Sequence, residues 1–131
     1  MTPTPTWTGA LTGCNSVRSV AISDDGNLIS AVANKSSGGK LFVFDSTGAL
    51  KWSQPTQHNP NSTSIDATGK FVTVADGYPD ETPGAFYLFD ALAGTLMWNY
   101  PTNNMSWPMQ IAANGKAMVA GSDNSYVYYF L

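Results

Sequence analysis

The chain has 131 residues, of which 43% are hydrophobic, and this is enough for one domain with an ordinary core. Six Lys and Arg against nine Asp and Glu give a net charge of -3, which excludes the basic surface needed to bind nucleic acid or an anionic membrane. Charged residues make up only 11%, and this composition favours strands and turns over helices.

Cysteine content and the N-terminal sequence exclude further classes. Cys14 is the only cysteine, so neither an intrachain disulfide nor a cysteine-based zinc site can form. Residues 1–6 lack a basic region followed by an apolar run and therefore do not resemble a secretory signal. No segment approaches the roughly 20 apolar residues that span a bilayer. We therefore expect a cytoplasmic protein by default.

Recurring landmarks indicate an internal repeat of about 45 residues. The tryptophans are 45 and 46 residues apart, the isoleucines are 43 and 46 apart, and each isoleucine is followed four positions later by a glycine. The three sets are Trp7, Trp52 and Trp98; Ile22, Ile65 and Ile111; and Gly26, Gly69 and Gly115. Several landmarks that share one period predict three repeats, at about residues 7–50, 51–96 and 97–131, in one domain covering residues 1–131.

Each repeat contains four short predicted strands, because apolar runs alternate with turn residues. The first strand carries the tryptophan, at residues 7–11, 50–54 and 96–100. The second is small and apolar, at 19–22, 63–65 and 109–111, and a glycine-containing hairpin turn follows it. The third lies at 28–33, 71–75 and 117–121, and the aromatic fourth at 41–44, 86–89 and 126–130.

Four-stranded units at this spacing predict an all-β fold, a β-propeller with three four-stranded blades in the chain. A single twisted sheet cannot bury both of its faces, whereas radially stacked sheets bury both. We expect the three repeat tryptophans to wedge between blades, since periodic aromatic residues in repeat proteins are usually core.

Two motifs carry a resemblance to a known family. They are Asp45-x-x-Gly48-x-x-x-Trp52 and Asp90-x-x-x-Gly94-x-x-x-Trp98, and both are similar to the repeat of the PQQ-like, or quinoprotein alcohol dehydrogenase-like, propellers. The segment from Val20 to Gly26 resembles equally the inner strand and turn of WD40-like repeats. The resemblance implies a propeller fold, which many relatives use as a scaffold or binding module. Quinone enzymes of this kind use a bound calcium and often a vicinal cysteine pair; with one cysteine here, we expect no cofactor and no metal.

The number of blades predicts an assembly. Propellers usually have about 4–8 blades, and this chain has sequence for three. It begins just before a tryptophan strand and ends just after an aromatic one. We expect a homodimer in which each N-terminal tryptophan strand completes the partner's last blade, which gives a six-bladed ring. The alternatives are an open three-blade fragment of a larger protein and a different oligomer.

Candidate ligand-binding residues come from the expected channel mouth, where loops lead into the inner strands. The positions four residues before the inner isoleucines are Arg18, Asn61 and Trp107. Arg18 offers a fork of donors to a carboxylate or phosphate, and Trp107 offers a face for stacking. His58, the only histidine, is a further candidate; because no acid adjoins it, we expect a solvated loop residue, and we predict no catalytic residue.

The longest insertion, residues 76–84, is predicted to be a stiff surface loop, which is either solvated decoration or a partner contact through Asp76, Tyr78, Asp80 and Glu81. Its acids could instead hold calcium, although the spacing does not match an EF-hand loop. The function that the sequence favours is a non-enzymatic module that binds a protein, peptide or small polar ligand. The alternatives are a small hydrolase or lyase acting at the channel mouth and a carbohydrate-binding, lectin-like propeller.

Overall fold

The computed structural model describes residues 2–78 and 83–131, and within them it contains strands and turns but no helix. Three antiparallel sheets account for these strands. The first consists of β1 (Ser16–Ile22), β2 (Leu28–Asn34), β3 (Gly39–Asp45) and β4 (Leu50–Thr56). The second consists of β5 (Asn59–Ile65), β6 (Phe71–Tyr78), β7 (Ala85–Asp90) and β8 (Leu96–Pro101). The third consists of β9 (Ser106–Ile111), β10 (Met118–Ser122) and β11 (Val127–Phe130). The all-β prediction is confirmed.

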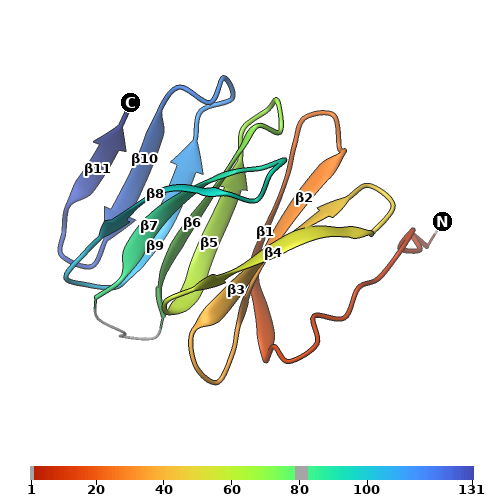
Figure 1. Ribbon diagram of the computed structural model, residues 1–131, viewed down its shortest axis with the longest axis horizontal. Coiled ribbons are helices and arrows are strands. Elements are labelled where there is room, and N and C mark those ends of the chain that lie inside the picture. The colour runs from red at the N-terminus through yellow and green to blue at the C-terminus, as the bar shows by residue number, and fades with distance from the viewer. Residues whose placement is uncertain (1, 79–82) are drawn as a thin grey trace.

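The strands of each sheet follow one another in chain order, and the three sheets lie face to face along the long axis of the molecule (Figure 1). The strands that open the sheets, β1, β5 and β9, contact one another in sequence. The tryptophan strands β4 and β8 form the opposite edges of their sheets. Each of these sheets therefore ends on its tryptophan strand, whereas the sequence repeats begin on it.

Two apolar layers hold the sheets together. The layer between the first and second sheets contains Leu28, Val32, Leu41 and Val43, facing Val72, Val74, Tyr87 and Phe89. The layer between the second and third contains Ala75, Phe86 and Leu88, facing Met109, Met118 and Ala120. The central strands of the second sheet are covered on both faces, which explains why β7 is apolar along nearly its whole length.

Two of the three repeat tryptophans, Trp52 and Trp98, pack between neighbouring sheets as predicted, whereas Trp7 packs on the first sheet alone. Trp52 belongs to the first sheet, but its indole N–H donates to Ala91 O of the second at 2.8 Å, and its ring lies 6.0 Å from that of Phe89. The ring covers Gly94, where an added Cβ would lie 2.8 Å from the indole carbons. Trp98 of the second sheet likewise packs on Phe130 of the third, with ring centroids 5.1 Å apart.

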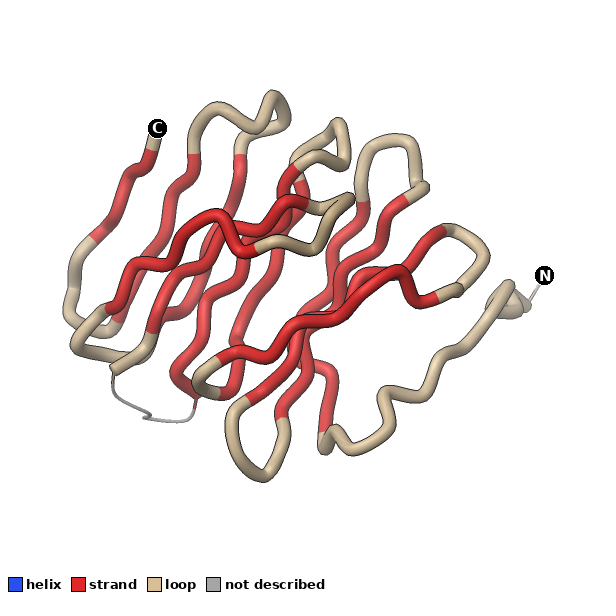
Figure 2. The backbone as a smooth tube through the Cα atoms, viewed as in Figure 1, coloured by secondary structure: helices blue, strands red, loops and turns tan. Residues whose placement is uncertain are grey.

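The predicted strand at residues 7–11 is wrong. Residues 2–15 contain no strand and run as a loop beside the first sheet (Figure 2). The indole of Trp7 nevertheless donates to Ser46 O at 3.1 Å and covers Gly48, as Trp52 covers Gly94. The N-terminus and β11 lie at opposite ends of the stack (Figure 1). A β-strand requires a pairing partner, and within the described chain this segment has none.

Candidate functional site

The three predicted mouth residues occupy corresponding places on neighbouring strands. Arg18, Asn61 and Trp107 lie near the starts of β1, β5 and β9, at the end of the sheets where the chain passes from β4 to β5 and from β8 to β9. The register of each strand with its partner shifts at this point, between Val17 and Ser19 in β1 and between Pro60 and Ser62 in β5. Bulges redirect side chains and are over-represented beside functional sites.

Hydrogen bonds tie two of these positions together directly. Asn61 Nδ2 donates to Ser106 O at 2.5 Å, and Ser62 Oγ donates to Trp107 O at 2.9 Å. On the other side, Thr63 N donates to Ser19 Oγ at 3.3 Å, which links β5 to β1. Strands β1, β5 and β9 therefore hold Arg18, Asn61 and Trp107 at fixed positions relative to one another.

Two buried acceptors at this end of the sheets, Asn34 Oδ1 and Asn61 Oδ1, lack a hydrogen-bond donor within the described residues. Asn61 Oδ1 is buried and accepts no hydrogen bond within the described part of the chain. A buried acceptor left without a donor is costly, and in native proteins it usually marks a ligand or water site. On either side, Arg18 is exposed and the Trp107 side chain is 39% exposed. The arrangement offers an acceptor between a cation and an aromatic face.

Trp107 also borders an open hollow on the outer face of the third sheet. The hollow measures about 420 Å³ and is lined by Trp107, Pro108, Ser122, Asp123, Tyr126 and Val127, among others. Trp107 therefore lies where the mouth meets the uncovered end of the stack. In the single chain its side chain is 39% exposed, so it is not buried between two sheets.

Asp76 is not a surface-loop residue, and this part of the loop prediction is wrong. It lies in β6, is fully buried, and accepts from Tyr87 Oη at 2.7 Å, Ala85 N at 2.7 Å and His58 N at 3.0 Å. Burial raises the pKa of Asp76, although these donors oppose the shift. Burial and the adjacent carboxylate raise the pKa of Tyr87 as well. The cluster anchors the connection between the first two sheets.

The remaining sequence candidates have mixed outcomes. His58 is half-buried beside Asp76 and is not a solvated loop residue. Tyr78 ends β6, while Asp80 and Glu81 lie outside the described residues. Cys14 is a half-buried loop residue packed near Leu11. The buried Asp76 could not be found from sequence, because its partners come from two other parts of the chain.

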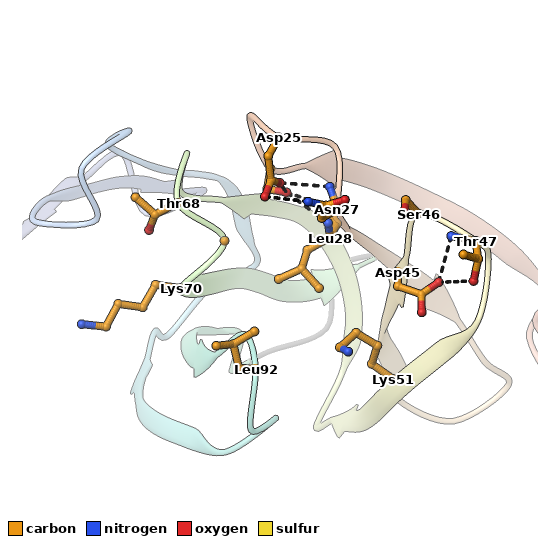
Figure 3. A pocket seen from close by; sticks show the side chains of 12 residues that line it. Asp25, Asn27, Leu28, Asp45, Ser46, Thr47, Lys51, Thr68, Lys70 and Leu92 are labelled. Carbon is orange, nitrogen blue, oxygen red and sulfur yellow. Dashed lines mark hydrogen bonds between the residues drawn. The ribbon is translucent and has the colours of Figure 1, made fainter.

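Sequence reasoning also missed a pocket at the opposite end of the sheets. It measures about 400 Å³ and lies among the hairpin turns of the first two sheets, with Asp25, Asn27, Asp45, Thr47, Lys51 and Lys70 in its lining (Figure 3). Its carboxylates are already engaged: Asp25 accepts from Asn27 N and Asp45 accepts from Thr47. These hydrogen bonds lower the pKa of both groups. We assign these carboxylates to turn stabilisation.

Two negative findings concern the described residues, 2–78 and 83–131. No group of three or more His, Cys, Asp or Glu side chains in this part of the chain is placed to hold a metal ion. No helix here is long and apolar enough to cross a membrane.

Comparison with known proteins establishes the fold alone. No protein-family model and no curated protein matches the sequence. In contrast, 390 chains of solved structures match the fold, so the likeness lies in the backbone more than in the sequence. One of them is hydrazine synthase of Kuenenia stuttgartiensis, with a TM-score of 0.66 and 16% identity over 88% of this chain. The match covers 31% of that protein, so this chain spans about a third of its length.

Proposed function

We propose that this chain is a three-blade segment of a PQQ-like or WD40-like β-propeller and that it acts as a binding module, not as an enzyme. The stacked sheets of four, four and three strands support the propeller assignment, as do Trp52 and Trp98, each of which packs on the next sheet. The observation that carries the binding function is the bulged row of Arg18, Asn61 and Trp107 across the innermost strands.

The chemistry of this row favours a peptide that ends in a carboxylate. The Arg18 guanidinium suits the terminal carboxylate, because its planar fork matches two oxygens. The buried Asn61 Oδ1 suits a backbone N–H of the ligand. The exposed face of Trp107 suits a ring or apolar side chain next to it. A peptide supplies all three groups within a short distance.

The alternative of a hydrolase or lyase has weaker support. Five aspartates are engaged as hydrogen-bond acceptors: Asp25, Asp45, Asp66, Asp76 and Asp90. General base catalysis requires a carboxylate or histidine within reach of a substrate proton. The Asp76 carboxylate is buried and accepts three hydrogen bonds that fix the sheet connection, which favours a structural role.

The test is retention of two hexapeptide pools, one with free C-terminal carboxylates and one with amidated C-termini. We expect the free-carboxylate pool to bind about tenfold more tightly, since a charge-assisted hydrogen bond contributes roughly 1.5–3 kcal/mol. Arg18→Gln should remove this difference. Lys51→Gln, a charge change in the pocket at the opposite end, is the matched control and should behave like the wild type. Equal retention of both pools by the wild type would refute the proposal.

A further inference from the structure

Each tryptophan strand of this fold joins two sheets by two different interactions. The backbone at Trp52 pairs with Val43 in its own sheet, while the indole docks on Ala91 and Gly94 of the next. The backbone at Trp98 pairs with Leu88 in the same way. A tryptophan segment is therefore complete only when its backbone pairs with a strand of one sheet and its ring packs on the neighbouring sheet.

Trp7 has only the second of these interactions. Its indole lies on Ser46 and Gly48 of the first sheet, at a ring distance of 6.0 Å from Phe44, which repeats the geometry of Trp52 and Phe89. The backbone around it pairs with no strand in the described chain. At the far end of the stack, β11 is an edge strand in a sheet of three. At one end of the stack the Trp7 segment thus has no strand to pair with, and at the other end the third sheet lacks a fourth, outer strand beside β11.

The faces at the two ends match this arrangement. On the third sheet, Val127 and Tyr129 are 79% and 66% exposed, whereas Leu41 and Val43 at the corresponding positions of β3 are fully buried under the next sheet. On the first sheet, Val20 and Ile22 of β1 are 65% and 61% exposed. Apolar surface of this extent on a soluble domain marks an interaction site.

We propose that the occupant of both ends is a second copy of this chain, whose residues 5–9 pair with β11 as its fourth strand. In the first sheet, Val43 pairs with Trp52 and Leu41 pairs with Gln54. The same register in the third sheet places Trp7 opposite Tyr129 of the partner copy and Gly9 opposite its Val127. Pro5 falls opposite Phe130; the outer strands β4 and β8 also carry prolines, which an edge strand tolerates.

Two copies suffice because the contact is reciprocal. The third sheet of each copy meets the first sheet of the other, and a two-fold axis relates the two identical contacts. This closure covers both edges and both apolar faces, which removes the liability of an exposed edge strand. It also brings Trp107 of one copy near the β1 end of the other. The six-bladed assembly therefore extends the row of Arg18, Asn61 and Trp107, although each chain already contains that row.

Disulfide cross-linking tests the register. In a Cys14→Ser background, Gly9→Cys and Val127→Cys proteins are mixed and oxidised. Directly opposite Cβ atoms lie about 4.5–5.5 Å apart and diagonal ones about 7–8 Å, while a disulfide needs about 3.5–4.5 Å. We expect a covalent two-chain product from this pair and at least tenfold less from the shifted control, Gly9→Cys with Tyr129→Cys. Equal cross-linking by both pairs would overturn the register.

The mass in solution tests the occupant. Light scattering should give twice the 13.9 kDa of one chain. Val127→Asp should give a single-chain mass with an unchanged circular dichroism spectrum, because this side chain is exposed in the single chain. A wild-type mass of one copy, or of more than two, would overturn the proposal. The peptide test depends on Arg18 within one chain, whereas the mass and cross-linking tests depend on contacts between chains. Failure of either proposal therefore leaves the test of the other valid.

Discussion

Gly94→Ala tests whether the tryptophan contact between sheets stabilises the fold. Gly94 has a φ of 72°, and alanine in this left-handed region costs about 1–2 kcal/mol. The new Cβ would lie 2.8 Å from the Trp52 ring, and overpacking of this kind costs about 1–3 kcal/mol more. Trp52 cannot easily move, because strand pairing holds its backbone and Ala91 O holds its indole. We expect a total loss of about 2–5 kcal/mol.

Gly26→Ala is the matched control. Gly26 has the same φ of 72°, but the nearest atom to an added Cβ is Ile22 Cδ1 at 4.0 Å, so only the backbone cost of about 1–2 kcal/mol applies. Urea unfolding, followed by circular dichroism, gives the free energy of unfolding of each variant. If Gly94→Ala is no more destabilising than Gly26→Ala, the tryptophan contact is not the constraint that we describe.

Three further changes have defined outcomes in the same unfolding assay. Asp76→Ala should cost about 3 kcal/mol or more, because it leaves two buried backbone N–H groups and the Tyr87 hydroxyl without their acceptor; a loss under about 1 kcal/mol would contradict this role. Burial raises the pKa of Asp76 in the folded state, so the part of the stability that depends on its ionisation is full below the ordinary pKa of 3.8 and is lost as pH rises through the folded-state pKa. Asp76→Asn should remove that fall, and an unchanged pH profile would contradict it. Trp52→Phe should cost at least about 1 kcal/mol through the lost hydrogen bond to Ala91 O, and an undiminished stability would refute that bond.

Local signals explain the parts of the fold that the sequence predicts well. The turn glycines at 26, 69 and 115 all have positive φ, between 69° and 72°, as the hairpin prediction requires. The predicted strand at 28–33 is β2 with one residue added, and 71–75 lies inside β6. These elements depend on residues close in sequence. A fixed period then transfers each local prediction to the other repeats.

Features that depend on distant parts of the chain escaped prediction. Residues 7–11 have the pattern of a strand, but the pattern cannot supply the partner that a strand needs. Asp76 follows an apolar run and precedes prolines, so it reads as the start of a loop; its burial comes from the connection at His58, eighteen residues earlier. The positions of Arg18, Asn61 and Trp107 could be predicted from the repeat of about 45 residues. That Asn61 Oδ1 is buried without a donor could not.

Head-to-tail repetition constrains how this chain can assemble. The turn at Gly48 contacts Trp7, the turn at Gly94 contacts Trp52, and Trp98 packs on Phe130 of the third sheet. An open stack therefore has different contact surfaces at its two ends. Such contacts either close into a ring or grow into a fibre. Closure with two copies requires six sheets that turn by about 60° each. We therefore expect the scattering mass to stay constant as protein concentration rises; a mass that increases steadily would show that the rotation between sheets does not close the ring.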